Sequence, residues 1–136
     1  VLAAAAEAGI AAADTAVVVG YGKDAIQAAL AAEGAGAVTL IVQEPQLGTG
    51  HAVQAAQSWW QRYARVLVVH GDMPLLAAAT LTGLAAQQQT HGCAGVLATA
   101  TPSTPRAYGR ILRDPQRPEL VLTVRGIGYK FSPDGV

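Results

Sequence analysis

Short apolar runs alternate along this chain with segments that carry helix-type patterning. Four runs are apolar and of strand length: 16–20, 37–42, 65–70 and 93–101. Four other segments favour helices: 1–8, 23–33, 51–60 and 80–89. Because strands and helices alternate, the sequence predicts the α/β fold class, with a doubly wound, mostly parallel sheet joined by right-handed crossovers.

The helical pattern is clearest in the segment 23–33. Ile26 and Leu30 stand four residues apart, which places both side chains on one face of a helix. Gly34 follows and suits a helix end, as Gly9 does after the first predicted helix. We therefore expect both helices to stop at their glycines.

The composition changes after residue 101, where prolines that interrupt helices become frequent: Pro102, Pro105, Pro115 and Pro118. The sequence predicts one short strand over residues 108–112. Residues 120–124 and 129–131 favour strands, and the glycines between them are typical of a β-hairpin turn. The expected organisation is an α/β domain over residues 1–114, followed by a linker and β-hairpin tail over residues 115–136.

The distribution of charged side chains also changes near residue 105. Residues 1–105 hold three basic and six acidic side chains, whereas residues 106–136 hold six basic and three acidic ones. The 136 residues have a formal net charge of zero and suffice for one domain with its own core. The tail is too weakly basic to indicate nucleic-acid binding by itself, so we expect no nucleic-acid partner.

The cysteine count and the lengths of the apolar runs indicate the compartment. Cys93 is the only cysteine, so no internal disulfide can form and a cytoplasmic location is expected. No run approaches the roughly 20 apolar residues of a membrane span, so no membrane partner is expected. The Ala-rich start carries Glu7 and no basic residue, unlike a signal peptide, and the absence of an initiator Met indicates a truncated chain.

The candidate chemistry lies in two motifs that follow predicted strands. One is the loop Gln46-Leu47-Gly48-Thr49-Gly50-His51-Ala52, and the other is Gly71-Asp72. Ligands of doubly wound sheets bind outside the carboxyl ends of the strands, so we expect the motifs to converge. The glycines would let a polar ring or a phosphate approach the backbone, or they could only form a tight turn. The loop matches neither the phosphate-loop nor the dinucleotide fingerprint.

Three titratable side chains are candidates for the chemistry. Asp72 could hold Mg²⁺ beside substrate phosphates, or it could only form hydrogen bonds in its turn. One carboxylate does not complete a magnesium site. His51 and His70 could act as acid or base, although neither has a carboxylate or a nucleophile at a telling spacing.

Three motifs occur in a fixed order along the chain: Val42-Gln43-Glu44-Pro45-Gln46-Leu47-Gly48-Thr49-Gly50-His51-Ala52, Gly71-Asp72-Met73-Pro74-Leu75-Leu76 and Ala107-Tyr108-Gly109-Arg110-Ile111. Together they resemble the uridyltransferase domain of bacterial bifunctional N-acetylglucosamine-1-phosphate uridyltransferase/glucosamine-1-phosphate acetyltransferases. The resemblance extends to about residue 114 and covers only the early to middle part of that domain. It implies a partial fold of the nucleotide-diphospho-sugar transferase type.

The resemblance also implies a reaction and a set of site residues. An oxygen of N-acetylglucosamine-1-phosphate attacks the α-phosphorus of UTP, pyrophosphate leaves, and UDP-N-acetylglucosamine, a peptidoglycan precursor, forms. Gln43, Gly48 and Thr49 would recognise the uracil. Asp72 would bind Mg²⁺. The remaining implied substrate-site residues are His70, which stands where the family often has Tyr, Gly71 and Gly109.

Several parts of the family's site have no match in this sequence. They are the Gly-rich loop that grips the triphosphate, the later Glu and Asn of the sugar site, the Asn of the metal site and the β-helix acetyltransferase domain. We therefore expect these 136 residues to have little or no catalytic activity.

The tail resembles a different family. Residues 118–131, with Arg125 and Gly126-Ile127-Gly128, are similar to the C-terminal hairpin of winged-helix DNA-binding domains in response regulators. No helix-turn-helix precedes them, so we expect a chimera or gene fragment joined near residues 113–119. Three functions stay open: a nucleotidyltransferase-derived domain with weak uridine-nucleotide affinity, a non-enzymatic DNA-binding or regulatory protein, and an α/β remnant without function.

Overall fold

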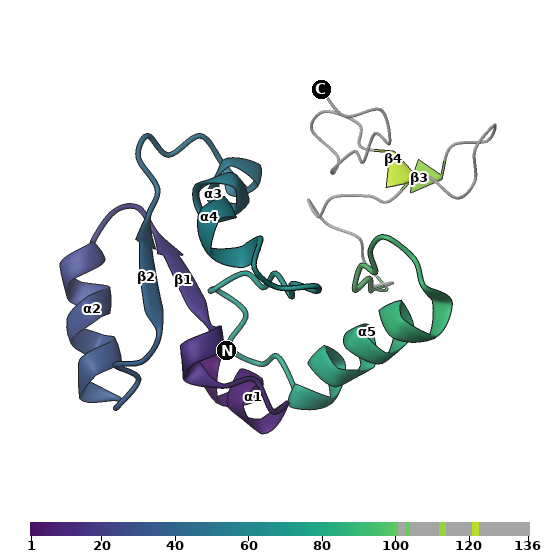
Figure 1. The fold of residues 1–136 in the computed structure, drawn as a ribbon, viewed down its shortest axis with the longest axis horizontal. Helices are drawn as coiled ribbons and strands as arrows, with labels where there is room; N and C mark the ends of the chain where they lie inside the picture. The colour runs from purple at the N-terminus through teal and green to yellow at the C-terminus, as the bar shows by residue number, and fades with distance from the viewer. Residues whose placement is uncertain (101–102, 104–111, 114–120, 123–136) are drawn as a thin grey trace. The chain divides into compact units, whose positions relative to one another are not determined.

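The computed structural model describes residues 1–100, 103, 112–113 and 121–122, which fall into two compact units, Val1–Leu97 and Ala98–Val136 (Figure 1). The first unit contains α1 (Leu2–Glu7), the 3-10 helix η1 (Ala12–Asp14), β1 (Ala16–Val19), α2 (Lys23–Ala32), β2 (Thr39–Val42), α3 (Thr49–Ala55), α4 (Gln57–Trp60) and α5 (Ala78–His91). The second contains β3 (Leu112–Arg113) and β4 (Val121–Leu122), which pair antiparallel.

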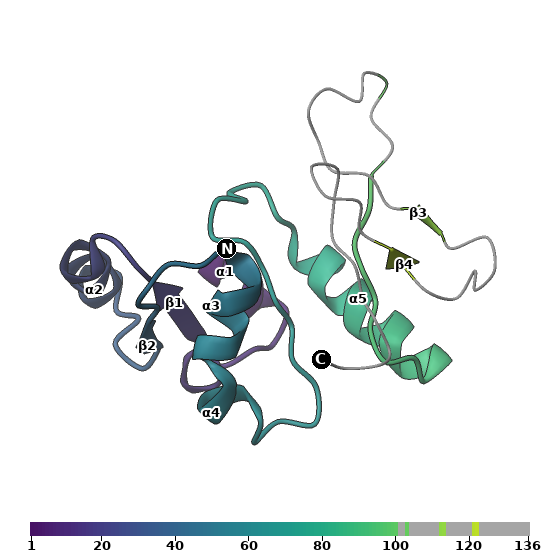
Figure 2. The same cartoon turned by 90° about the horizontal axis from the view of Figure 1, so that it is seen from above.

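A parallel pair of strands organises the first unit. β1 pairs with β2 along the whole length of both strands, and the backbone N–H of Gln43 then donates to Val19 O at 2.7 Å. Helix α2 connects the strands and lies on the side of β2, while α3 lies on the side of β1 (Figures 1 and 2). The predicted α/β class and the parallel arrangement are thus confirmed.

The predicted helices all form, with small changes at their ends. Ile26 and Leu30 are the only half-buried residues of α2, which confirms their shared face. Gly9 and Gly34 follow α1 and α2 with φ of +82° and +70°, as expected of helix-ending glycines. The helix predicted over 51–60 starts at Thr49 and is broken at Ala56 into α3 and α4.

The core of the described residues is small. Its buried side chains come from two places: Ala4 in α1 and Leu81 in α5, whose helices contact each other, and Val19 at the end of β1 with Ala56 between α3 and α4. Leu81 and Val19 are only 2% and 3% exposed. Two of these four buried side chains are alanines, so little apolar area is removed from water there.

Two predicted strands are wrong. Residues 65–70 and the described part of the run 93–101 are not in any strand. The side chains of Val66 and Val68 are exposed, with 63% of Val68 open to solvent. The physical reason is that an apolar run reports only a preference for burial, whereas a strand also needs a neighbour that accepts and donates its backbone hydrogen bonds. β1 has such a neighbour on one side only among the described residues.

In the second unit, Leu112 pairs with Leu122 and Arg113 pairs with Val121. The strand predicted over 108–112 and the hairpin predicted between 120–124 and 129–131 otherwise lie outside the described residues, as do residue 101 and Gly109.

An aromatic cluster follows α4. The hydroxyl of Tyr63 donates to Asp14 Oδ1 at 2.9 Å and accepts from Arg62 Nη2 at 2.9 Å. The guanidinium carbon of Arg62 lies 5.1 Å from the ring centroid of Trp59 and 5.0 Å from that of Tyr63, within reach of a cation–π attraction. The cluster ties the chain after α4 to the residue that ends η1.

Candidate functional site

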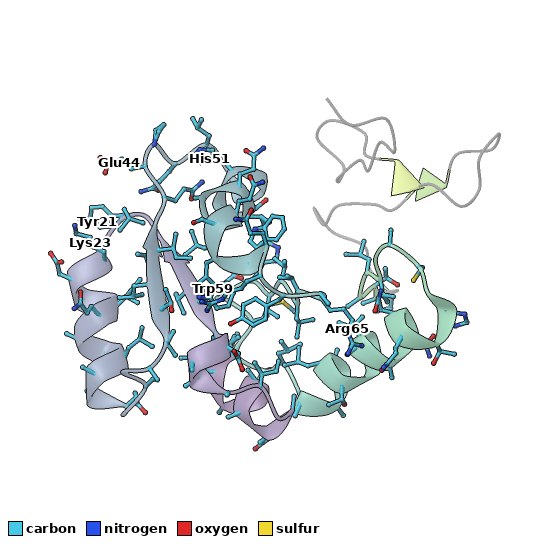
Figure 3. The ribbon with its side chains drawn as sticks, in the orientation of Figure 1. Tyr21, Lys23, Glu44, His51, Trp59 and Arg65 are labelled. Atoms are coloured by element: carbon cyan, nitrogen blue, oxygen red, sulfur yellow. The ribbon has the colours of Figure 1, made fainter. Side chains whose placement is uncertain are left out.

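A cavity of about 590 Å³ opens at the carboxyl ends of β1 and β2. Two segments line it, residues 20–24 after β1 and residues 42–46 at the end of β2. Tyr21, Lys23 and Glu44 gather at this end of the strand pair (Figure 3). Ligands of parallel α/β proteins bind at this edge, so the cavity lies where the sequence predicts a site.

A glycine lets the two lining segments approach each other. A Cβ added at Gly20 would overlap the side-chain amide of Gln46 and would lie 2.8 Å from its Cγ. Because Gly20 has no Cβ, the loop after β2 can lie directly on the turn after β1. Gly20 therefore permits the close approach of Gln46 at one side of the cavity lining.

Gln43 connects this cavity to the glycine loop. It lines the cavity, and its side-chain Nε2 donates to Gly48 O at 2.9 Å. The same nitrogen lies 3.0 Å from Nδ1 of His51, in the first turn of α3. Both Gln43 and His51 are half-buried. One side chain at the end of β2 thus holds both the loop and the start of the following helix.

The backbone of Gly48 explains why the loop needs a glycine there. Its φ of +100° and ψ of −179° lie in a region that residues with a Cβ essentially never adopt. This conformation turns the chain into α3 immediately after the carbonyl that Gln43 binds. Thr49 is exposed and is the first residue of α3.

The contact between His51 and Gln43 is not predicted from the sequence. The sequence indicates His51 only as a possible acid or base, whereas the structure places its Nδ1 beside the side chain of Gln43, eight residues earlier. A usable signal was present, because the Cβ of a helical residue points toward the N-terminus of its helix. A side chain in the first turn of α3 therefore leans toward the end of β2.

The second predicted motif is not joined to the first. His70, Gly71 and Asp72 are exposed, in a stretch without helix or strand between α4 and α5. They do not line the cavity at the strand ends, and no hydrogen bond among the described residues connects them to Gln43, Gly48 or His51. The structure brings together Gln43, Gly48 and His51, while Gly109 lies outside the described residues.

A metal ion would find one protein ligand in this region. Within residues 1–100 and the few described beyond them, no three His, Cys, Asp or Glu side chains cluster as metal ligands. The exposed carboxylate of Asp72 offers hard oxygen donors, which suit an ion that keeps several waters and also binds substrate phosphates. The chemistry fits a divalent ion held partly by its nucleotide.

No helix in the described part of the chain is long and apolar enough to cross a membrane.

The parallel strands, the cavity at their ends and the glycine loop that enters α3 define an α/β domain of the nucleotide-binding class. The model of one family, the MobA-like NTP transferase domain, matches residues 1–120. This chain belongs to that family of nucleotidyltransferases, which generally use a divalent metal ion.

Curated relatives agree with this assignment. The chain is 48% identical over 100 residues to the bifunctional protein GlmU of Paraburkholderia phytofirmans, 74% of this chain and 21% of that protein. It is 42% identical over 101 residues to the GlmU of Thermosynechococcus vestitus, 74% of this chain and 22% of that protein. The chain therefore spans about a fifth of the length of these relatives. Neither match lends support to the response-regulator resemblance of residues 118–131.

Proposed function

We propose that this chain carries the uridine-recognition part of a nucleotidyltransferase that forms UDP-N-acetylglucosamine. In that reaction an oxygen of N-acetylglucosamine-1-phosphate bonds to the α-phosphorus of UTP, the bond to the β-phosphate oxygen breaks, and pyrophosphate leaves. The observation that carries the proposal is the hydrogen bond of Gln43 to Gly48, because it holds the glycine loop against a cavity at the strand ends.

Gln43, Gly48 and Thr49 are the proposed uracil-recognition residues. Uracil presents an N–H donor between two carbonyl acceptors, so a side-chain amide and backbone N–H groups can satisfy its edge. Gly48 has no Cβ and nothing within 4 Å of the place where one would stand, so a flat ring can approach its backbone. The local geometry therefore supports a base-recognition loop better than a phosphate cradle.

The phosphate and sugar side of the reaction is assigned to the segment around Asp72 and to Gly109. Asp72 is the proposed ligand of Mg²⁺, which when bound neutralises charge on the phosphates. The proposed neighbours of the nucleotide sugar are His70, Gly71 and Gly109. Exposure of Asp72 supports this role only in that a hydrated ion could reach its carboxylate. A cytoplasmic location, where nucleotide substrates are present, belongs to the same proposal.

A titration of the chain with nucleotides tests the uracil assignment. We expect UTP with Mg²⁺ to bind more tightly than CTP, since the two nucleotides differ only in the base edge. Gln43→Ala should reduce the preference about tenfold, the effect of one well-formed hydrogen bond to a ligand. Gln57→Ala, which removes an exposed amide from α4, is the matched control. Equal affinities of the unaltered chain for UTP and CTP would contradict the proposal.

The expectation of little or no turnover is tested separately. Pyrophosphate release is measured with UTP, N-acetylglucosamine-1-phosphate and Mg²⁺ against a protein-free blank. Release well above the blank would show that these residues suffice for catalysis. Uridine selectivity without pyrophosphate release would support recognition as the role of this part of the chain.

A further inference from the structure

We propose that His51 is a positioning residue that fixes the orientation of the Gln43 side-chain amide, so that the site selects a base with a hydrogen-bond donor at the position that Gln43 contacts. This inference rests on the proposed function and adds to it a residue and a chemical rule for the base. The juxtaposition that carries it is the pair of contacts made by Gln43 Nε2, at 2.9 Å to Gly48 O and 3.0 Å to His51 Nδ1.

The first contact decides which end of the amide is nitrogen. A backbone carbonyl oxygen can only accept a hydrogen bond, so the Gln43 atom that faces Gly48 O must be the NH₂ group. An oxygen in that place would set two acceptors against each other. Gly48 therefore favours one of the two amide orientations.

The second contact decides the role of the imidazole. The Gln43 NH₂ group has only donors, so Nδ1 of His51 accepts its second N–H. The ring proton of the neutral imidazole then sits on Nε2. A flipped Gln43 amide would lose the hydrogen bond to Gly48 O, and it would keep one to His51 only if the ring proton moved from Nε2 to Nδ1. His51 therefore adds the free-energy cost of that tautomer change to the cost of the flip.

The outcome is a fixed polarity at the cavity. Both N–H groups of the Gln43 amide are engaged, and Oε1 has no hydrogen-bond partner among the described residues. Because Gln43 lines the cavity, Oε1 is the atom of its amide that is left to accept a hydrogen bond from a ligand. The contact with His51 is partly buried, which reduces competition from water for that hydrogen bond, whereas the contact with Gly48 is exposed.

Pyrimidine chemistry turns this polarity into selectivity. The N3 position of uracil carries a proton and can donate to Oε1, whereas N3 of cytosine has a lone pair and would oppose it. A flipped amide would present N–H to cytosine instead. By opposing the flip, His51 raises the preference for the keto base without touching the nucleotide.

The test compares the ratio of the CTP and UTP dissociation constants, both with Mg²⁺, in variants of the full chain. UTP and CTP carry the same triphosphate, so its contribution to binding cancels in the ratio of the two dissociation constants. His51→Ala should lower the ratio about fivefold, the effect of one ordinary hydrogen bond. His51→Asn should restore most of it, because its amide oxygen can stand near the place of Nδ1. His91→Ala is the matched control, since His91 is an exposed histidine whose ring forms a hydrogen bond with Gln87 on α5.

A measurement without ligand separates this inference from the proposed function. ¹⁵N spectra should show an unprotonated Nδ1 and a protonated Nε2 in His51, and a Gln43 side-chain amide whose exchange with water accelerates in His51→Ala. If these signals are found but the unaltered chain binds UTP and CTP equally, the proposed function fails and the positioning role stands. A protonated Nδ1 would overturn the inference, and so would a preference for UTP that the unaltered chain shows and His51→Ala keeps in full.

Discussion

The loop after β2 and the loop that carries Asp72 both follow apolar runs, yet only the first is anchored. Residues 39–42 pair with β1, and the hydrogen bond from the Gln43 N–H to Val19 O fixes where the loop begins. Residues 65–70 are equally apolar but unpaired, so Asp72 follows a segment with exposed side chains. The difference shows that a motif is positioned by the backbone pairing of the segment before it, not by that segment's hydrophobicity.

The loop backbone offers the largest test of this contrast. Gly48→Ala should destabilise the chain by about 1–3 kcal/mol, because Ala cannot adopt φ near +100° with extended ψ without strain. Gly50→Ala is the control two residues further along, since Gly50 lies within α3 and has open space at its Cβ position. It should be neutral or stabilise by up to about 1 kcal/mol. Urea unfolding measures both, and equal losses would mean that the Gly48 conformation is not required.

Burial offers the next test. Val19→Thr places a hydroxyl at a position that is 3% exposed and should cost about 1–3 kcal/mol. Val68→Thr makes the same chemical change at a position that is 63% exposed and should cost less than about 0.5 kcal/mol. Chemical denaturation of both variants gives the comparison. If Val68→Thr costs as much as Val19→Thr, the run 65–70 is buried as the sequence predicts, and the contrast between the loops disappears.

Hydrogen exchange tests the pairing directly. The amide of Gln43, bonded to Val19 O, should exchange at least about tenfold more slowly than the amides of residues 66–69, a difference of about 1.4 kcal/mol in local opening. Exchange followed by NMR resolves the individual amides. Similar protection across the two segments would indicate a ladder on both.

The smallest expected effect on stability comes from the close approach of Gln46 to Gly20. Gly20→Ala displaces the end of the exposed and flexible Gln46 side chain, so its stability should change by less than about 0.5 kcal/mol. The informative readout is local: the Gln46 side-chain resonances should shift while those of Gln57 stay. A large loss of stability would mean that the Gln46 side chain and the loop after β2 cannot move to make room for the added methyl group.

Local patterns were enough to predict the elements that need few distant partners. Ile26 and Leu30 mark the buried face of α2, and glycines mark the ends of α1 and α2. The strands of β1 and β2 were also predicted, because their apolar runs are joined by that one helix. The strands predicted over 65–70 and 93–101 are wrong, because the sequence of one segment does not show which other segment it pairs with.

The candidate site divides in the same way. The sequence led to Gln43 and Gly48 through a motif in which loop and helix are contiguous, and the contact between them is present. The role of His51 required a three-dimensional relation between the first turn of α3 and the strand end. Convergence of Asp72 with the glycine loop required a third paired strand, which periodicity alone could not supply, and it stays a prediction.

The hydrogen bond between Tyr63 and Asp14 joins positions 49 residues apart. Everything from β1 to α4 lies between them, including both paired strands and the whole loop of Gln43, Gly48 and His51. Closing so long a segment costs more entropy than any other contact in it, so this bond should form late in folding. The hydrogen bond therefore marks the ends of a continuous segment: a polypeptide trimmed to residues 12–63 would keep both paired strands and the residues proposed to select the base, and it would lack the unpaired runs.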